Sequence, residues 1–147
     1  MDVAEEGAAR ANPLENALPI SKRVWREMLN HCLAEKPFEA CGLISGRYGR
    51  AETLWRMVNV DRTPDSFAMD SRQIQQVFQM ISKRGEQLVG IYHSHPTTPP
   101  YPSKEDIAYA SYTDVAYMIL SLAGPQPALG CFNIRGMHAI PQRFFIC

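Results

Sequence analysis

The amino-acid sequence predicts one α/β domain in which helices alternate with the strands of a sheet. The chain has 147 residues, close to the usual size of a single domain, and 46% of them are hydrophobic. Apolar residues recur at helical spacing in three segments, and short apolar or alternating runs bounded by glycine or proline separate these segments. We therefore expect one compact core, no internal repeat and no second domain.

The first part of the chain predicts a tail, a helix and a hairpin. Residues 1–19 are rich in Ala, Glu and Asn without sustained periodicity, so we expect a flexible tail before a domain at 20–147. Ser21 is a typical helix N-cap residue, and the apolar residues after it predict a helix that ends at Pro37. Two antiparallel strands are then predicted by the runs CGLISGRYG and ETLWRMVNV.

The second part predicts two more helices and four more strands. After the turn-rich run RTPDSFAMD, Ser71 is expected to cap a helix that closes at Gly85. The loop PTTPPYP is rich in proline, which disfavours helix interiors and central strands, and it precedes a shorter helix that opens at Ser103. The strands are expected at 87–92, 115–122, 129–135 and 137–145.

Composition argues against several classes of function. Fifteen Lys and Arg residues balance fifteen Asp and Glu residues, so no net charge attracts the protein to nucleic acid or to an anionic membrane. No apolar run reaches the roughly 18 residues of a membrane helix, and the N-terminus lacks the pattern of a secretory signal, so we expect a cytoplasmic protein. The four cysteines form no C-x-x-C pair and are expected to be reduced thiols, with a bond between one buried pair as the alternative.

Two histidines at the end of LVGIYHSHP are candidate metal ligands. Side chains alternate between the faces of a strand, so His93 and His95 project from one face and their imidazoles can reach one ion. An H-x-H pattern by itself is more often explained by one histidine that makes a core hydrogen bond and one that lies on the surface. A metal site therefore requires a third ligand.

Asp106 is the candidate third ligand. It follows Ser103 in an S-x-x-D pattern, which is typical of a helix capping box. A carboxylate held in the first turn of a helix is already oriented, and we expect its other oxygen to face the metal. Two imidazoles and one carboxylate leave a fourth tetrahedral position for water, as in catalytic zinc sites, and this ligand set suits zinc better than calcium or magnesium.

The stretch H-S-H-P-T-T-P-P-Y-P-S-K-E-D resembles the signature of the JAMM (MPN-plus) metalloproteases, which is H-x-H, seven residues and S-x-x-D. The spacing agrees at every position, and Glu39 in PFEACGLISG resembles the glutamate that family members carry upstream. The resemblance covers roughly residues 21–145. It implies a three-layer α/β fold, a mixed curved sheet flanked by helices, which the family shares with cytidine deaminases.

The resemblance also implies roles for individual residues. His93, His95 and Asp106 would bind one zinc ion per chain. Glu39 would act as general base and acid, and Ser103 would donate a hydrogen bond to the developing oxyanion. Because bound zinc lowers the pKa of water towards about 7, a carboxylate can take the proton at neutral pH. Without the downstream motif, Glu39 would be interpreted as a solvated loop carboxylate.

The implied function is hydrolysis of the amide bond after the C-terminal Gly-Gly of a ubiquitin-like protein. Eukaryotic deubiquitinases of the family carry a long insertion after the aspartate ligand, whereas only 41 residues follow Asp106 here. The chain thus resembles the small stand-alone prokaryotic type. Its implied partners are ubiquitin-like sulfur-carrier proteins, either as extended precursors or as adducts to an amino acid. The pathway and the oligomeric state stay open.

Three rival interpretations differ in their motifs. Non-catalytic MPN scaffolds have lost zinc ligands, whereas every position is present here. A zinc deaminase of related fold would need H-x-E with a downstream P-C-x-x-C, and neither is found. A DNA-associated relative with a similar histidine motif stays as an alternative, because it shares the zinc chemistry.

We further predict that the substrate tail binds in an extended conformation, along an exposed sheet edge or along residues 62–70. A narrow passage to the metal, walled by the PTTPPYP loop and the RTPDSFAMD turn, would admit Gly-Gly and exclude a β-carbon. Prolines in both loops would stiffen these walls.

Overall fold

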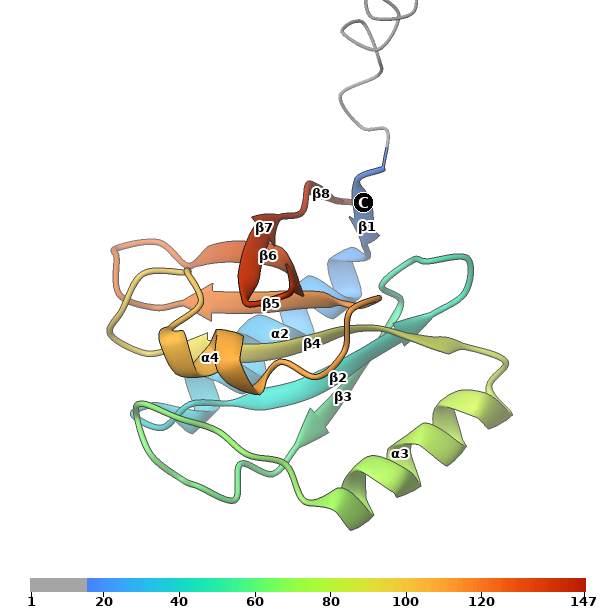
Figure 1. The fold of residues 1–147 in the computed structure, drawn as a ribbon, viewed down its shortest axis with the longest axis horizontal. Coiled ribbons are helices and arrows are strands. Elements are labelled where there is room, and N and C mark those ends of the chain that lie inside the picture. The colour runs from blue at the N-terminus through green and yellow to red at the C-terminus, as the bar shows by residue number, and fades with distance from the viewer. Residues whose placement is uncertain (1–15) are drawn as a thin grey trace, which may run out of the picture.

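A mixed six-stranded sheet runs through the middle of the domain in the computed structural model, which describes residues 16–147 (Figure 1). The strand order is β3-β2-β4-β5-β6-β7; β4 and β5 are parallel, and the other neighbours are antiparallel. The elements in chain order are β1 (Leu18–Ile20), α2 (Lys22–Glu35), β2 (Cys41–Gly46), β3 (Thr53–Met57), α3 (Ser71–Lys83), β4 (Gln87–His95), α4 (Lys104–Tyr109), β5 (Ala116–Ser121), β6 (Ala128–Arg135), β7 (His138–Pro141) and β8 (Phe144–Ile146).

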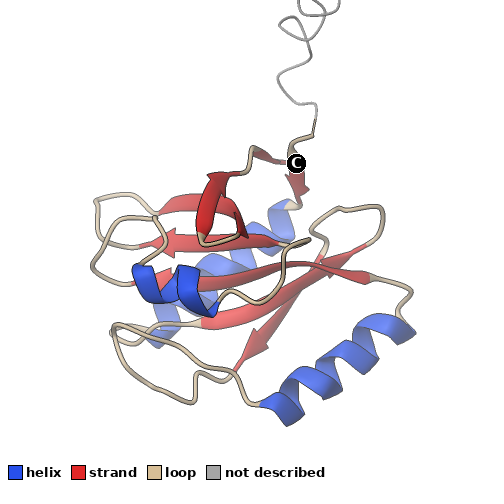
Figure 2. Cartoon of the chain, viewed as in Figure 1, coloured by secondary structure: helices blue, strands red, loops and turns tan. Residues whose placement is uncertain are grey.

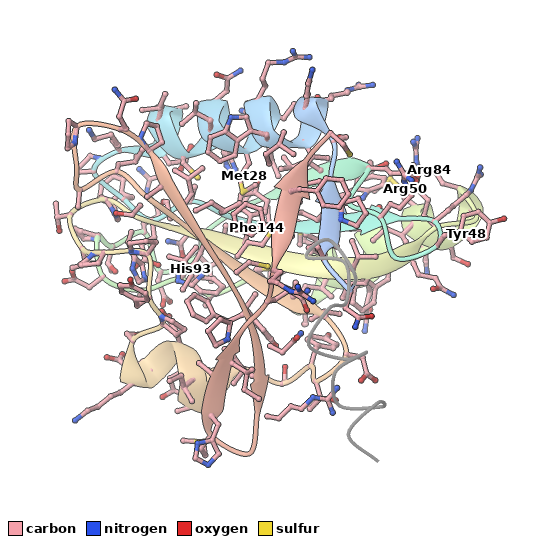
Figure 3. The ribbon with its side chains drawn as sticks, turned by 90° about the horizontal axis from the view of Figure 1, so that it is seen from above. Met28, Tyr48, Arg50, Arg84, His93 and Phe144 are labelled. Carbon is pink, nitrogen blue, oxygen red and sulfur yellow. The ribbon has the colours of Figure 1, made fainter. Side chains whose placement is uncertain are left out.

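Helices cover both faces of this sheet (Figure 2). Seen from above, α2 lies on one side of the sheet and α4 on the other (Figure 3). The buried residues of α3, Val77 and Ile81, pack with Ile91 of β4 and Tyr117 of β5 on the face that α2 does not cover. The helix–sheet–helix arrangement confirms the expected three-layer α/β fold.

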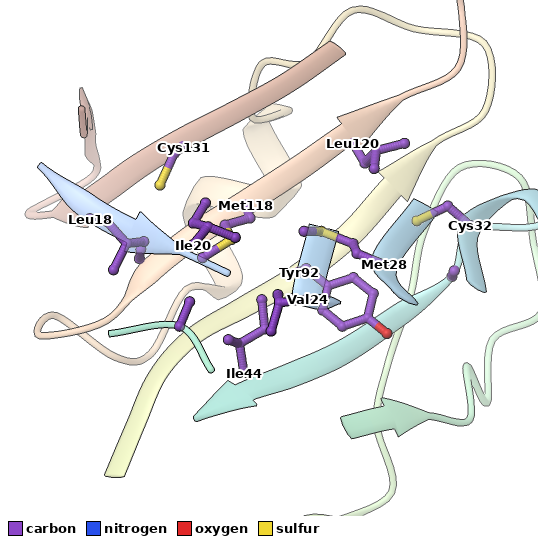
Figure 4. Close-up of a cluster of buried hydrophobic side chains, with 13 residues drawn as sticks. Leu18, Ile20, Val24, Met28, Cys32, Ile44, Tyr92, Met118, Leu120 and Cys131 are labelled. Carbon is purple, nitrogen blue, oxygen red and sulfur yellow. The ribbon is translucent and has the colours of Figure 1, made fainter. Parts of the chain in front are cut away.

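The first core fills the space between α2 and the sheet (Figure 4). The Ser21 hydroxyl accepts the Val24 N–H at 3.1 Å and caps the helix, as expected from the sequence. The buried positions of α2 recur at helical spacing, so one face of the helix packs on the strands. These positions are Val24, Met28, His31 and Cys32.

Strand β4 lies at the centre of the sheet, and its side chains alternate between the two cores. Tyr92 belongs to the core under α2, where its hydroxyl lies 2.7 Å from His31 Nδ1. Ile91 belongs to the opposite core, and strand alternation places His93 and His95 on that same face. Both histidines are therefore directed to the side of the sheet that carries α4.

The structure corrects three details of the predicted elements. The N-cap of α3 is Asp70, whose Oδ2 accepts the Gln73 N–H at 3.1 Å, and Ser71 is the first helical residue. Strand β4 continues beyond the predicted end at residue 92, so that both histidines lie within it. The segment 137–145, expected as one strand, divides into β7, on the edge of the main sheet, and β8.

Strands β1 and β8 form a second, two-stranded parallel sheet that joins the two ends of the domain. Leu18 pairs with Phe144 and Ile20 with Ile146, and both N-terminal residues are buried. The folded domain therefore begins at least two residues before position 20, inside the predicted tail. Residues 1–15 of that segment lie outside the described residues.

Within residues 16–147, the structure contains no helix long and apolar enough to cross a membrane. The four cysteines are free thiols, and Cys32, Cys41 and Cys131 are buried.

Candidate metal centre

Three side chains predicted as ligands converge at the end of β4. His93 Nε2 lies 3.1 Å from Asp106 Oδ2, His95 Nε2 lies 3.2 Å from the same oxygen, and the two Nε2 atoms are 3.2 Å apart. Both histidines are buried at the end of the strand, and Asp106 is partly buried in the first turn of α4. The seven-residue loop 96–102, between the end of β4 and the N-cap residue Ser103, thus brings a strand end and a helix start together.

The orientation of His95 depends on the loop that follows it. Its Nδ1 lies 2.8 Å from the Pro99 carbonyl oxygen, so the Nδ1–H donates to that oxygen and Nε2 is directed at Asp106. The Ser121 hydroxyl holds the loop by donating to the Thr98 carbonyl at 2.6 Å. A Cβ atom at Gly130 would collide with the Pro100 carbonyl oxygen, so glycine is required for this close approach.

His93 is oriented by an aromatic contact. Its ring stacks on Phe67 with the centroids 4.5 Å apart and an interplanar angle of 25°. The His93 side chain is nearly inaccessible to solvent, whereas its Nε2 faces Asp106. Phe67 belongs to the segment between β3 and α3, so this segment supports the site from a second side.

Asp106 is held by the capping box that the sequence predicts. The Ser103 hydroxyl accepts the Asp106 N–H at 3.0 Å, and the Ser103 N–H donates to Asp106 Oδ2 at 2.9 Å. The structure corrects one detail, because the oxygen that accepts this bond is the same Oδ2 that faces the histidines. One carboxylate oxygen has two lone-pair directions, so capping and metal binding can share it.

The charge state of the cluster follows from its contacts. Burial lowers the pKa of His93 despite the nearby Asp106 carboxylate. Burial also acts to lower the pKa of His95, but the hydrogen bonds with Asp106 and the Pro99 carbonyl outweigh it and raise this pKa. Burial acts to raise the pKa of Asp106, and the two histidines overcome it and hold that pKa well below its usual range. In the metal-free protein, Asp106 is therefore ionised beside His95.

The donor set fits a divalent metal ion. A tetrahedron of zinc ligands with bonds of about 2.0–2.1 Å has edges of about 3.3–3.4 Å, close to the observed triangle. In the neutral form of His95, Nε2 carries a lone pair that faces the Asp106 carboxylate and the His93 ring. Two imidazoles and a carboxylate with converging lone pairs need a cation or a proton between them.

Glu39 lies immediately before β2 and next to this cluster. Cys41 pairs with His93, and Ser94 N–H donates to the Ala40 carbonyl at 3.0 Å, so the strand pairing brings Glu39 beside His95. The residue is only 3% exposed, and its Oε1 has no hydrogen-bond partner among the described residues. Burial raises the pKa of the Glu39 carboxyl to about 8. Such a carboxyl is poised to exchange a proton near neutral pH.

A cleft of about 620 Å³ opens beside His93 and Asp106. Its walls differ from those predicted. The turn RTPDSFAMD contributes residues 65–69, as expected, but the PTTPPYP loop contributes only Pro102. The opposite wall comes from α4 and the connection after it, with Tyr109 and Tyr112 among the lining residues. The proline loop instead supports His95, through the carbonyls described above.

Sequence reasoning missed two contributors to the site. Phe67 has no feature in the sequence that indicates a contact with a histidine 26 positions later. Pro99 acts through its backbone carbonyl, which every residue type possesses, so residue identity gives no signal. All five predicted site residues, by contrast, lie in or beside the cluster; Ser103 is exposed at the start of α4.

Comparisons with known proteins identify the family of the chain. A family model described as prokaryotic homologues of the JAB domain matches residues 21–133. The chain is 35% identical over 100 residues to the CysO-cysteine peptidase of Mycobacterium tuberculosis, which covers 67% of this chain and 68% of that protein. It is 32% identical over 108 residues to a probable TtuB-protein conjugate cleaving protease of Thermus thermophilus, with 73% and 72% covered.

Solved structures with the same fold include protein DSY2949 of Desulfitobacterium hafniense. Its TM-score is 0.82 at 32% identity, and the match covers 88% of this chain and 92% of that one. A structure described as a JAMM metalloprotease-like zinc site superimposes with a TM-score of 0.56 at 17% identity over 88% and 98% of the two chains, which supports the fold alone. The match over most of its length, together with these relatives, shows that the chain belongs to the JAMM/MPN family as one of the prokaryotic homologues of the JAB domain.

Proposed function

We propose that this protein is a cytoplasmic zinc-dependent peptidase or isopeptidase that binds one zinc ion per chain. Its reaction would be hydrolysis of the amide bond after the C-terminal Gly-Gly of a ubiquitin-like sulfur-carrier protein. His93, His95 and Asp106 would hold the metal. Glu39 would be the general base and acid, and Ser103 would stabilise the oxyanion.

The observation that carries this proposal is the state of Glu39. A buried carboxylate oxygen without a hydrogen-bond partner, such as Glu39 Oε1, is costly, and native proteins rarely retain one without a functional reason. It lies beside a donor set that fits zinc, and burial raises its pKa to about 8. This combination supports proton transfer at a metal site rather than a structural role.

The chemistry divides between the metal and the protein. Zinc in this donor set would supply Lewis acidity, which lowers the pKa of water towards about 7 and polarises a carbonyl group. Glu39 would take the proton of the attacking water and return it to the leaving amine. His95 would keep its Nε2 available because its Nδ1–H is already bonded to the Pro99 carbonyl. The reaction requires no covalent intermediate with the protein.

Ser103 is suited to assist at the carbonyl oxygen. Its hydroxyl oxygen accepts the Asp106 N–H, and the hydroxyl hydrogen is left to donate to a further acceptor. The residue is exposed at the start of α4, beside the ligand Asp106. Ser103 would therefore offer a preorganised donor to the negative charge that develops on the substrate carbonyl oxygen.

The cleft supports an extended substrate tail along residues 67–69. The Ala68 N–H donates to Asn59 Oδ1 at 3.1 Å, and the Ala68 carbonyl accepts the Val60 N–H at 2.9 Å. Among residues 16–147, none hydrogen-bonds to the main chain of Phe67 or Met69. This alternation is that of an edge strand, and both residues line the cleft. A Gly-Gly tail that pairs here would reach His93 and Asp106.

The relatives support the substrate class. One is named for cleaving a CysO-cysteine adduct and another for cleaving conjugates of the protein TtuB. We therefore infer a ubiquitin-like carrier as the acyl part of the substrate. Either an amino acid or a protein amine would be the leaving group.

Cleavage of purified carriers tests this function. Carriers with a C-terminal Gly-Gly extension, a cysteine adduct or a lysine conjugate would be incubated with zinc-loaded protein and followed by mass spectrometry. We expect release of the carrier with a free Gly-Gly terminus, and much lower kcat/KM when either glycine is replaced by alanine. A metal-loaded protein that cleaves none of the three would favour a scaffold or a DNA-associated role. Equal cleavage of Gly-Ala, Ala-Gly and Gly-Gly tails would contradict only the narrow passage.

A further inference from the structure

Ser94 separates the two histidines of β4, but it projects to the opposite face of the sheet. It is fully buried, and neither the metal cluster nor the cleft includes it. Its hydroxyl oxygen accepts the Ala40 N–H at 2.8 Å. Ala40 is the residue that directly follows Glu39, so this bond joins the ligand strand to the chain that carries the proposed base.

The contact between Ala40 and Ser94 has two hydrogen bonds of different kinds. The Ser94 N–H donates to the Ala40 carbonyl at 3.0 Å, as in a regular antiparallel pair. The Ala40 N–H, however, donates to the Ser94 side chain instead of completing the pair through the backbone. The hydroxyl thus holds the main chain where it enters β2, one residue after Glu39.

Few other contacts hold Glu39. Its backbone N–H donates to the Thr63 carbonyl at 2.9 Å, and its carbonyl accepts the Asn59 side-chain amide at 2.9 Å. The side-chain Oε1 has no partner among the described residues. The position of this carboxylate relative to His95 therefore depends on its main chain, and Ser94 is the only one of these anchors that belongs to the ligand strand itself.

The other side of the Ser94 hydroxyl is also occupied. The Cys32 thiol of α2 lies beside it. Cys32 is fully buried in the core under α2. The hydroxyl is consequently fixed between a helix and the Ala40 backbone, and has little freedom to rotate away.

On the basis of the function proposed above, we propose that Ser94 is a positioning residue for catalysis. Its hydroxyl clamps the main chain at Ala40 and so sets the distance of the Glu39 carboxylate from the metal ligands His93 and His95. It touches neither substrate nor metal. Partners that orient active groups in this way typically change activity by about 10- to 100-fold when removed.

Steady-state kinetics of Ser94→Ala with zinc content measured on the same sample test this role. We expect kcat to fall about 10- to 100-fold, KM to stay within about twofold, and zinc content to equal that of the wild type. Ser94→Thr, which keeps the hydroxyl, should retain kcat within about threefold. Ser45→Ala is the matched control, because Ser45 is an equally buried serine whose hydroxyl bonds Glu86 and Trp55 away from the cluster. It should keep the wild-type kcat.

A double-mutant cycle separates positioning from general damage. If Ser94 acts through Glu39, then Ser94→Ala should change kcat less than about twofold in the Glu39→Gln background. An equal loss in both backgrounds, or a wild-type kcat in Ser94→Ala, would overturn the proposal. If Ser94→Ala does not fold, Ser94→Cys replaces it, since the thiol has a similar shape but is a weak acceptor. A full kcat in that variant also overturns the proposal.

Amide exchange keeps this test independent of the proposed function. If wild-type protein cleaves no carrier, the proposed function fails, and Ser94 is then judged by NMR hydrogen exchange at Glu39 and Ala40. Faster exchange at both amides in Ser94→Ala, with unchanged exchange at Leu43, supports the clamp. Unchanged exchange at Glu39 and Ala40 rules it out.

Discussion

Two glutamates lie near opposite ends of β2, in opposite electrostatic situations. Near Ser45, the Glu86 carboxylate accepts the Ser45 hydroxyl at 2.7 Å and the Thr53 hydroxyl at 3.0 Å, and lies 3.5 Å from Arg84. Burial acts to raise the pKa of Glu86, but these partners lower it. Before Cys41, Glu39 is buried without a partner for Oε1, and burial raises its pKa to about 8.

This difference distinguishes a structural carboxylate from one available for chemistry. Satisfied hydrogen bonds stabilise the charged form of Glu86 and with it the fold. The environment of Glu39 disfavours its charged form in the metal-free protein. Glu39 therefore lowers the stability of the fold, but it can exchange a proton. Substitutions near the two ends of the strand should therefore differ in their effects on catalysis and on stability.

The largest effect is expected from removal of a ligand. His93→Ala or His95→Ala should abolish zinc binding and activity, because two remaining protein ligands hold zinc poorly against water. Metal content by elemental analysis is the measurement. His31→Ala is the control, since His31 is also buried but bonds Tyr92 on the opposite face of the sheet. It should keep its zinc, and full occupancy in either ligand variant would refute the assigned site.

The next effect is expected at the two glutamates. Glu39→Gln should retain zinc and lose about 10²- to 10⁴-fold in kcat, because an amide of nearly equal volume cannot accept the proton. Glu86→Gln should change kcat by less than about threefold. Steady-state kinetics of both variants on the same carrier measure this difference in kcat. Near-normal turnover by Glu39→Gln would mean that another group is the base.

A smaller loss is expected from Ser103→Ala. Removal of one oxyanion donor should lower kcat by about 10²-fold, and loss of the helix cap should cost about 1 kcal/mol of stability. Ser21→Ala separates the two effects, because Ser21 makes the same type of capping bond to Val24 far from the cluster. Thermal unfolding should show similar destabilisation in both variants. A similar kcat in both variants would remove Ser103 from the reaction.

The smallest effect concerns the stability of the metal-free protein. The pKa of Glu39, about 8 when folded against 4.5 ordinarily, means that the folded state binds the proton more tightly. Its burial therefore costs little below about pH 4.5 and destabilises the protein increasingly as pH rises towards 8. Glu39→Gln should raise the free energy of unfolding by about 1–3 kcal/mol at pH 8 and change it little at pH 4.5.

Glu86→Gln should behave in the opposite way. It loses hydrogen bonds to a charged acceptor, so we expect a decrease of about 1–2 kcal/mol at neutral pH. The folded pKa of Glu86 is lowered, so the contribution of this carboxylate is present above its ordinary pKa and is lost as pH falls below it. Urea unfolding at pH 4.5 and pH 8 measures both variants. The same sign of change in both at pH 8 would end the distinction between the glutamates.

Much of the site follows from local rules that a sequence contains. The alternation of side chains along a strand directs His93 and His95 to one face, and the S-x-x-D pattern specifies the capping box that orients Asp106. Both depend on residues a few positions apart, whose geometry the backbone determines. The helix capped by Ser21 and the hairpin of β2 and β3 were predictable for the same reason.

Tertiary structure alone decided the features that join distant segments. Leu18 lies in a strand because it pairs with Phe144, and no pattern within residues 1–19 contains that information. Glu39 becomes buried beside His95 because β2 and β4 pair, and Phe67 stacks on His93 because the segment after β3 folds over the strand end. The pKa of a carboxyl depends on the solvent it loses and the partners it meets. The residues of the site can therefore be identified from the sequence, whereas packing between distant segments gives Glu39 and Glu86 their different pKa shifts.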